Sequence, residues 1–217
     1  MYIGIEGAIG VGKTTLARLL QESFGARLLL EVFEENPFLS EFYTDRERYA
    51  FQTQIFFLLS RYHQQRRTVA EILNEGGNLI ADYTFEKDAL FAQFNLKGDE
   101  LDMYYNVHDA LAEKILPPDL IVYLRADTDV LMQRIAMRDR PYERSMERAY
   151  IQTVNQSYDE FFADGVDRRS PVITIDTNEL DYVRSIDDLK KVEERIRQRL
   201  KMAPFQTELP LDGEEAG

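Results

Sequence analysis

The sequence predicts an α/β fold, a five-stranded parallel sheet with helices on both faces. Runs with strand character alternate with runs of helical character along the 217 residues, and this order is typical of parallel sheets. A glycine-rich motif at residues 7–14 comes directly after the first apolar run, at the strand-to-helix turn where phosphate-binding loops lie. A hydrophobic content of 44% in a chain of this length is sufficient for one core, so we expect a single domain over residues 1–202.

The predicted strands are short runs rich in apolar and β-branched residues. Gly76-Gly77 precedes the third run and Pro117-Pro118 precedes the fourth, and both pairs end the helical pattern before them. The predicted strands span residues 1–6, 26–31, 78–82, 120–125 and 172–176.

The segments between the strands are predicted helices, because apolar residues recur there at helical spacing. In the first, Leu16, Leu19, Leu20 and Phe24 form one apolar face. Residues 203–217 contain two prolines and four acidic residues without a basic one, so we expect a mobile acidic tail there. The predicted helices span residues 13–24, 46–74, 85–95, 100–115, 128–137, 144–162 and 186–201.

Composition restricts the class of partner. With 39 acidic and 26 basic residues, the formal net charge of −13 would repel a phosphate backbone, so we expect no nucleic-acid partner. The absence of cysteine excludes a disulfide framework and a cysteine-based metal site. Without a signal peptide or a long apolar stretch, we expect a cytoplasmic protein that does not associate with membranes.

The motif at residues 7–14, Gly-Ala-Ile-Gly-Val-Gly-Lys-Thr, fits the pattern G-x-x-x-x-G-K-[ST]. Its glycines let successive backbone N–H groups point at a β-phosphate, and the following helix adds its positive N-terminal end. We expect Lys13 to bridge the β- and γ-phosphates and Thr14 to be a ligand of Mg²⁺. The predicted ATP-binding residues are Gly7, Ala8, Ile9, Gly10, Val11, Gly12, Lys13, Thr14 and Thr15, with Arg134 and Arg138 from a later helix.

Carboxylates follow the second and third predicted strands, at the sheet edge where ligands bind in open α/β folds. Glu31 ends the second strand, and a carboxylate there suits a general base that accepts the proton of an attacking hydroxyl. Glu34 and Glu35 follow; the alternative for them is a favourable interaction with a helix N-terminus. Asp82 ends the third strand, where we favour a role in organising Mg²⁺ over a role as helix N-cap alone.

Arg134, Arg138 and Arg140 recur along a helix that ends before Pro141. A solvated charged face is one interpretation. We favour an arginine-rich lid that neutralises charge in a transition state, because guanidinium groups match phosphate oxygens in fork geometry. Lys13, Glu31, Arg138 and Arg140 are therefore the predicted catalytic residues.

These residues give the chain a resemblance to a bacterial deoxyribonucleoside kinase, with the P-loop kinase fold shared with thymidylate kinases. The resemblance extends over roughly residues 1–200. Beyond the phosphate-binding loop, the segments that carry it are Glu31-Val32-Phe33-Glu34, Asn36-Pro37-Phe38-Leu39, Phe42-Tyr43, Arg48-Tyr49-Ala50-Phe51, Gln54, Ser60-Arg61, Asp82, Asp88-Ala89-Leu90-Phe91-Ala92 and Arg138-x-Arg140-x-x-Glu143.

The resemblance implies Mg²⁺-dependent transfer of the γ-phosphoryl group of ATP to the 5′-hydroxyl of a deoxynucleoside in nucleotide salvage. It implies that Glu31 activates this hydroxyl, that Tyr43 and Glu143 hold the 3′-hydroxyl, and that Gln54 reads the base edge. The implied pair of Arg61 and Asp88 beside the exocyclic group favours purine deoxynucleosides or deoxycytidine over thymidine. The predicted substrate-binding residues are Glu31, Tyr43, Gln54, Arg61, Asp82, Asp88, Phe91 and Glu143, and the predicted metal site is Thr14 with Asp82.

Residue spacing supports part of this assignment. Gln54 and Arg61 lie seven residues apart and so share one face of the predicted helix 46–74, although a surface stripe is the alternative. Phe91 and Phe56 are candidates for stacking on a base. The histidines, His63 and His108, have no partner at metal-ligand spacing and receive no catalytic role.

The sequence departs from the family after the third predicted strand. The family commonly has an acid, an arginine and a serine there, whereas this chain has Asp82-Tyr83-Thr84. In relatives the arginine helps to place the base and the incoming phosphate. Arg61 and the arginines of the predicted lid are the candidates to replace it.

The family is usually homodimeric, and the resemblance implies a homodimer here through the predicted helices 85–95 and 144–162. Aromatic residues of these helices that look exposed in the sequence, among them Tyr150, Tyr158 and Phe162, would form the hydrophobic interface.

Other functions remain open at this stage. A nucleoside monophosphate kinase would share the loop, the sheet and the lid, but it needs a basic clamp for the acceptor phosphate where this chain is acidic. A nucleotide-switch protein would leave Tyr43, Gln54 and Glu143 without a purpose. A kinase for another small alcohol is the third alternative.

Overall fold

A parallel β-sheet forms the centre of the computed structural model, which describes residues 1–144, 146–163 and 169–203. Within these residues the sheet has five strands in the order β2-β3-β1-β4-β5, and all pairs are parallel. The predicted α/β class and five-stranded parallel sheet are thus confirmed. The strands are β1 (Tyr2–Glu6), β2 (Ala26–Leu29), β3 (Asn78–Ala81), β4 (Leu120–Arg125) and β5 (Val172–Asp176).

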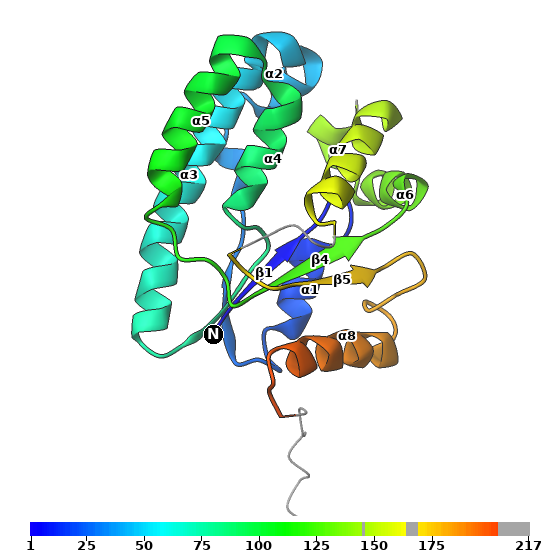
Figure 1. Ribbon diagram of the computed structural model, residues 1–217. Helices are drawn as coiled ribbons and strands as arrows, with labels where there is room; N and C mark the ends of the chain where they lie inside the picture. The colour runs from blue at the N-terminus through cyan, green and yellow to red at the C-terminus, as the bar shows by residue number, and fades with distance from the viewer. Residues whose placement is uncertain (145, 164–168, 204–217) are drawn as a thin grey trace, which may run out of the picture.

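Helices stand on both sides of this sheet (Figure 1). The upright group of α3, α4 and α5 lies on one side, and α1 and α8 lie on the other. The helices are α1 (Lys13–Leu20), α2 (Leu39–Thr44), α3 (Arg46–Asn74), α4 (Glu86–Asn95), α5 (Gly98–Ala112), α6 (Thr128–Arg138), α7 (Arg148–Phe161) and α8 (Ile186–Arg199), with 3₁₀ turns η1 (Phe33–Glu35) and η2 (Pro141–Glu143).

The predicted boundaries differ from the observed ones where local turns intervene. The second strand ends at Leu29, because the Glu31 N–H donates to the Asp82 side chain and not to a neighbouring strand. The helix predicted from residue 144 begins only at Arg148, after the separate turn η2. The short helix α2 was not predicted, since six residues are too few for a helical repeat to stand out. Of the predicted acidic tail, residues 204–217 lie outside the described residues.

The phosphate-binding loop joins β1 to α1 and is pressed against β4. Gly7 has φ +145°, and a Cβ there would lie 2.4 Å from the carbonyl oxygen of Leu124. Gly12 caps α1 with φ +106°, and a Cβ there would lie 2.4 Å from the Tyr182 hydroxyl oxygen. Because a side chain is excluded at both positions, glycine keeps the loop backbone at this edge of the sheet.

Glu6 fixes the end of β1 to its neighbours. Its buried carboxylate accepts hydrogen bonds from the Thr84 N–H (2.5 Å), the Thr84 hydroxyl (3.0 Å) and the Tyr158 hydroxyl (3.1 Å). Burial raises the pKa of Glu6, against the opposing effect of Lys87 and Lys13. The carboxyl ends of β1 and β3 and the helix α7 therefore meet around one buried acid beside the phosphate-binding loop.

Three aromatic residues assigned to an exposed helix face belong to the core. Tyr150, Tyr158 and Phe162 are 7%, 0% and 6% exposed, so the interpretation that they form a surface was wrong. Tyr150 and Tyr158 pack α7 against α4, with ring centroids 6.2 Å apart for Phe94 and Tyr150, whereas Phe162 packs on Tyr123 of β4. The homodimer stays a prediction.

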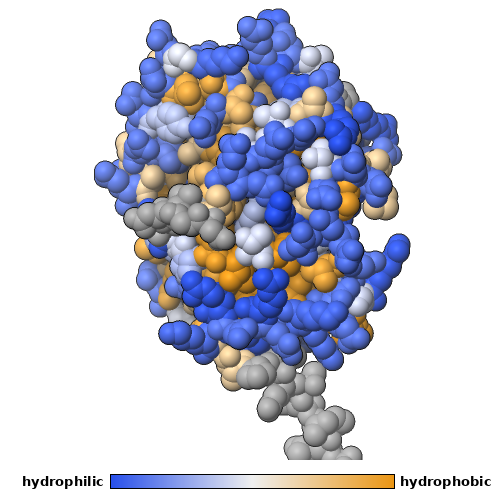
Figure 2. Space-filling view, turned by 45° about the vertical axis from the view of Figure 1, so that its right-hand side comes forward, coloured by the Kyte–Doolittle hydropathy of each residue, from blue (hydrophilic) through white to orange (hydrophobic). Residues whose placement is uncertain are grey.

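The molecular surface is predominantly hydrophilic on the face that Figure 2 shows, with apolar side chains gathered in limited patches. In the described part of the chain, no helix combines the length and the apolar composition that crossing a bilayer requires.

Candidate active site

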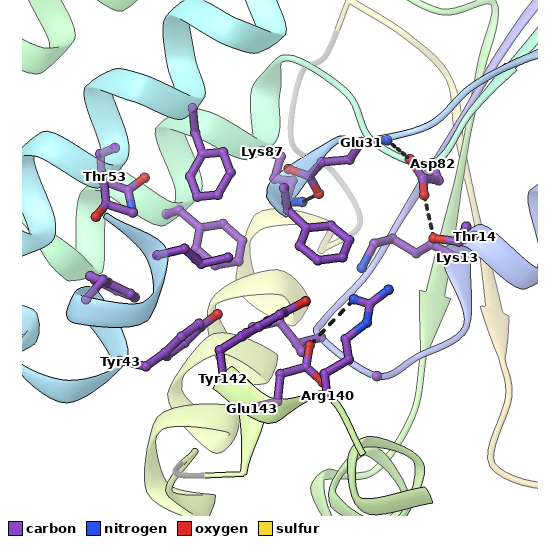
Figure 3. Close-up of a pocket in the computed structure, with 18 of the residues that line it drawn as sticks. Lys13, Thr14, Glu31, Tyr43, Thr53, Asp82, Lys87, Arg140, Tyr142 and Glu143 are labelled. Carbon is purple, nitrogen blue, oxygen red and sulfur yellow. Dashed lines mark hydrogen bonds and ion pairs between the residues drawn. The ribbon is translucent and has the colours of Figure 1, made fainter. Parts of the chain in front are cut away.

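A cavity opens between the phosphate-binding loop and the helices α2, α3, α4 and α7 (Figure 3). Its lining changes along its length, from the loop at one end, through a cluster of charged side chains, to aromatic and amide groups at the other. The lining residues are Ile9, Gly10, Lys13, Thr14, Glu31, Phe33, Leu39, Phe42, Tyr43, Thr53, Gln54, Phe57, Arg61, Asp82, Lys87, Phe91, Arg138, Arg140, Tyr142, Glu143 and Tyr150.

At the loop end, Lys13 and Thr14 are held by groups that a triphosphate would replace. The Lys13 ammonium donates to the carbonyl oxygens of Gly7 (2.6 Å) and Ala8 (3.1 Å). Burial and the nearby Lys87 ammonium lower the pKa of Lys13 to about 8, although neighbouring carboxylates oppose the shift. The Thr14 hydroxyl donates to Asp82 Oδ2 at 2.5 Å.

Glu31 lies at the centre of the cavity, and cations from two helices bind its carboxylate. Arg61 of α3 donates from Nε to Glu31 Oε1 (2.8 Å) and also from Nη2, while Lys87 of α4 donates to Oε2 (2.7 Å). Burial alone would raise the pKa of Glu31, but Arg61 and Lys87 together hold it well below its usual range. Glu31 is therefore an ionised carboxylate at neutral pH.

Arg61 also reaches a second carboxylate. Its Nη1 group forms an ion pair with Asp88, whose side chain is fully buried. The Asp88 Oδ2 oxygen accepts no hydrogen bond from the described residues. Arg61 itself lies over the Phe57 ring, 4.6 Å from its centroid. One guanidinium thus connects the end of β2 to α4.

Tyrosine rings and a buried glutamate form another part of the wall. The Tyr43 and Tyr142 rings stack with centroids 6.2 Å apart. Glu143 accepts hydrogen bonds from Arg138 Nε (3.1 Å) and Nη2 (2.5 Å), and Arg140 lies 3.7 Å from the same carboxylate. Gln54 is buried, and its Oε1 oxygen has no partner among the described residues.

The structure brings most of the sequence-predicted site residues into this one cavity. Asp88 is the exception among the substrate-binding set, because it adjoins the cavity through Arg61 and is not part of the lining. Arg134 does not line this cavity with Arg138 and Arg140, although it shares a second hollow with Arg138. Its guanidinium donates to the Val11 carbonyl (3.2 Å) and to the Thr177 carbonyl (2.7 Å), beside that second hollow next to the phosphate-binding loop.

Several lining residues were missed. Phe57, and not Phe56, contributes to the described lining of the cavity; the signal was available, since Phe57 lies three residues after Gln54 and shares its helix face. Lys87 lies four residues before Phe91 on α4 and was detectable by the same spacing. Tyr142 comes from the turn η2, for which periodicity gives no signal. The side chain of Glu34 is outside what the structure describes.

The known proteins that this chain resembles include deoxynucleoside kinases. The family described as deoxynucleoside kinase matches residues 3–201. The chain is 33% identical over 199 residues to a deoxyguanosine kinase of Bacillus subtilis (strain 168), covering 91% of this chain and 96% of that protein. It is 33% identical over 197 residues to a deoxyadenosine kinase of Dictyostelium discoideum, covering 88% and 78% of the two chains.

A solved structure agrees with these sequences. The structure of a deoxyadenosine kinase from M. mycoides, with the products dCMP and a flexible dCDP bound, superimposes with a TM-score of 0.78. The two chains are 26% identical, and the match covers 91% of this chain and 99% of that chain.

The lowered pKa of Lys13 predicts a pH dependence for triphosphate binding. Because phosphates favour the protonated ammonium, binding raises this pKa, and the affinity for ATP is expected to fall as the pH rises through about 8. Titration calorimetry between about pH 7 and pH 9.5 should show a loss of up to roughly tenfold per pH unit. The variant Lys13→Arg, which stays protonated, should lack this decline. A wild-type affinity for ATP that is constant over this pH range would contradict the binding of the triphosphate by Lys13.

Proposed function

The chain belongs to the deoxynucleoside kinase family, and we propose that it uses ATP and Mg²⁺ to phosphorylate the 5′-hydroxyl of a purine deoxynucleoside or deoxycytidine in nucleotide salvage. The observation that carries the proposal is the position of Glu31. Its carboxylate lies between the phosphate-binding loop and a chamber lined by Gln54, Tyr43 and Phe91. A nucleoside in that chamber would direct its 5′-hydroxyl toward both Glu31 and the γ-phosphate.

The reaction needs few covalent steps from the protein. The 5′-oxygen forms a bond to the γ-phosphorus, the bond from this phosphorus to the bridging oxygen of ADP breaks, and the hydroxyl proton passes to Glu31. Phosphoryl transfer has a loose transition state, so the proton leaves late, when the hydroxyl has become acidic. A carboxylate whose pKa lies below its usual range can therefore serve as acceptor, and positioning supplies most of the rate.

Charge on the transferred group requires cations close to the loop. Lys13 serves this purpose once its ammonium leaves the Gly7 and Ala8 carbonyls. Arg138 and Arg140, now paired with Glu143, are the proposed lid residues, since they line the same cavity. Arg140 also lies over the Phe33 ring at 4.2 Å, which limits its freedom. Arg134 supports the donor side through its bonds to Val11 and Thr177.

Thr14 and Asp82 fit a magnesium ion. Both present oxygen atoms, which Mg²⁺ prefers, and their side chains already meet at 2.5 Å beside the loop. Among the described residues, no three acidic or histidine side chains form a protein-only metal cage. The remaining ligands of a bound Mg²⁺ would come from phosphate and water. When bound, Mg²⁺ neutralises charge on the β- and γ-phosphate oxygens.

Base selection rests on buried acceptors. Gln54 offers a free carbonyl oxygen, and the adjoining Asp88 offers Oδ2. An exocyclic amino group supplies the hydrogen atoms that these oxygens lack, whereas thymine carries a carbonyl and a methyl group on the corresponding edge. A base without the amino group would leave buried acceptors unpaired, at a cost of about 1–3 kcal/mol each. The names of the relatives, deoxyguanosine and deoxyadenosine kinases, agree with this preference.

Monophosphate acceptors fit less well. The cations nearest the acceptor, Arg61, Lys87 and Arg138, are all paired with carboxylates, so an acceptor phosphate would meet Glu31 and Glu143 without a clamp. A cytoplasmic location and a homodimeric state remain part of the proposal. Tyr150 and Tyr158 are buried within the chain and so do not form the proposed dimer contact.

Replacement of Glu31 tests the proposed base. Incubated with ATP, Mg²⁺ and a panel of nucleosides and nucleoside monophosphates, the wild-type protein should yield deoxynucleoside 5′-monophosphates. Glu31→Gln should reduce kcat by about 10²- to 10⁴-fold, with a much smaller change in nucleoside affinity. The matched control Glu35→Gln, at an exposed position, should behave as wild type. Near-normal turnover by Glu31→Gln would exclude the role, and phosphorylation of monophosphates alone would exclude the proposed function.

Replacement of Gln54 tests base recognition. Gln54→Ala should lower kcat/KM for the preferred deoxynucleoside by roughly tenfold to hundredfold and should narrow the difference from thymidine, because one edge of the base loses its partner. Gln52→Ala, an exposed position on the same helix, is the control. An equal loss for every nucleoside would indicate a structural role for Gln54 instead.

A further inference from the structure

We propose that Lys87 is a positioning residue of the phosphoryl-transfer site, which holds the Glu31 carboxylate in place where position 83 supplies no arginine. The inference rests on the proposed function and extends it, because neither the phosphate-binding motif nor the family segments in the sequence include Lys87. Its basis is the location, the contacts and the surroundings of this one side chain.

Lys87 occupies an unfavourable place for a lysine. It is the second residue of α4, where the helix dipole is positive and disfavours a cation, and its side chain is only 8% exposed. Lysine is seldom buried unless it is paired. The compensating carboxylate is Glu31, 2.7 Å from the Lys87 ammonium, and Glu6 lies close enough to interact with it as well. The helix N-terminus disfavours the Lys87 ammonium, and the ion pair with Glu31 compensates for this.

The two oxygens of Glu31 have different partners. Arg61 takes Oε1, while Lys87 takes Oε2, and the two cations come from the separate helices α3 and α4. In Figure 3, Glu31 extends from the strand end toward Lys87, on the side of the cavity that faces Lys13. Without Lys87, Oε2 would lose its cation and the carboxylate could rotate about its remaining contact with Arg61. Lys87 therefore determines where the proposed base presents its second oxygen.

Tyr83 does not contribute a charge to the cavity. Its ring packs with Tyr2, Leu29 and Val69 in a separate apolar cluster, and its hydroxyl donates to Gln64 Oε1 at 2.5 Å. Tyr83 is absent from the described lining of the cavity. The replacement expected from the sequence was another arginine. Arg61 meets this expectation only in part, since it is shared with Asp88, and Lys87 supplies the second cation from four residues further along the chain than Tyr83.

Steady-state kinetics of Lys87→Met tests the proposal. We expect kcat to fall by about 10- to 100-fold with KM values for ATP and deoxynucleoside within roughly threefold of wild type, because binding groups are unchanged while the base is misplaced. Lys87→Arg, which keeps the charge, should recover most of kcat. Lys97→Met, at an exposed position, is the matched control for charge.

A double variant tests whether Lys87 acts through Glu31 or directly on the phosphoryl group. In Glu31→Gln, the additional change Lys87→Met should alter kcat by less than about threefold, because the group that Lys87 holds is already absent. A loss as large as in the wild-type background would overturn the proposal and indicate direct action on the phosphoryl group. Thermal unfolding and ATP binding of each variant identify misfolding, in which case Lys87→Arg and Lys87→Gln carry the comparison. If the wild-type protein phosphorylates no deoxynucleoside, the proposed function fails; if it does and Lys87→Met matches it, only the role of Lys87 fails.

Discussion

The site depends on the buried guanidinium of Arg61, which must be compensated by two carboxylates at once. A cation removed from water is costly unless it is paired and hydrogen-bonded, and Arg61 is 6% exposed. Glu31 supplies one partner from the end of β2, and Asp88 supplies the other from α4. Because one guanidinium binds both acids, it links the segment after β2 to α4. The cavity is the space that this arrangement leaves open.

This shared ion pair places two functions next to each other. On one side Glu31 faces Lys13 and the loop that receives the triphosphate, and on the other side Arg61 and Asp88 adjoin Gln54 and the chamber for the base. Lys87 completes the arrangement by binding the second oxygen of Glu31. The charges that would select the base thereby also orient the group that would accept the proton. Recognition of the base and transfer of the phosphoryl group would therefore depend on the same cluster of charged side chains.

The fold was largely predictable because its signals are local. Alternating patterns gave the strands, and the glycines at positions 7–14 gave the loop that sits after β1. Glu31 could be selected because strand ends are visible in the sequence. Gln54 and Arg61 came from the family resemblance, which their seven-residue spacing supported. The partners of Glu31 could not all be selected in this way. Lys87 was detectable as a lining residue, but it meets Glu31 across 56 positions of the chain, and only the folded chain shows that the two are partners. The burial of Tyr150 and Tyr158 was missed for the same reason, since helical periodicity does not reveal which face another helix covers.

A crystal structure of the protein with a deoxynucleoside and a non-hydrolysable ATP analogue tests the role of Glu31 most directly. We expect the 5′-oxygen to lie about 3 Å from the Glu31 carboxylate, in line with the γ-phosphorus, while the base edge meets Gln54. The ion pairs of Arg61 with Glu31 and Asp88 should persist in that complex. A deoxynucleoside bound with its 5′-oxygen turned away from Glu31, or a complex in which Arg61 leaves both carboxylates, would contradict the account.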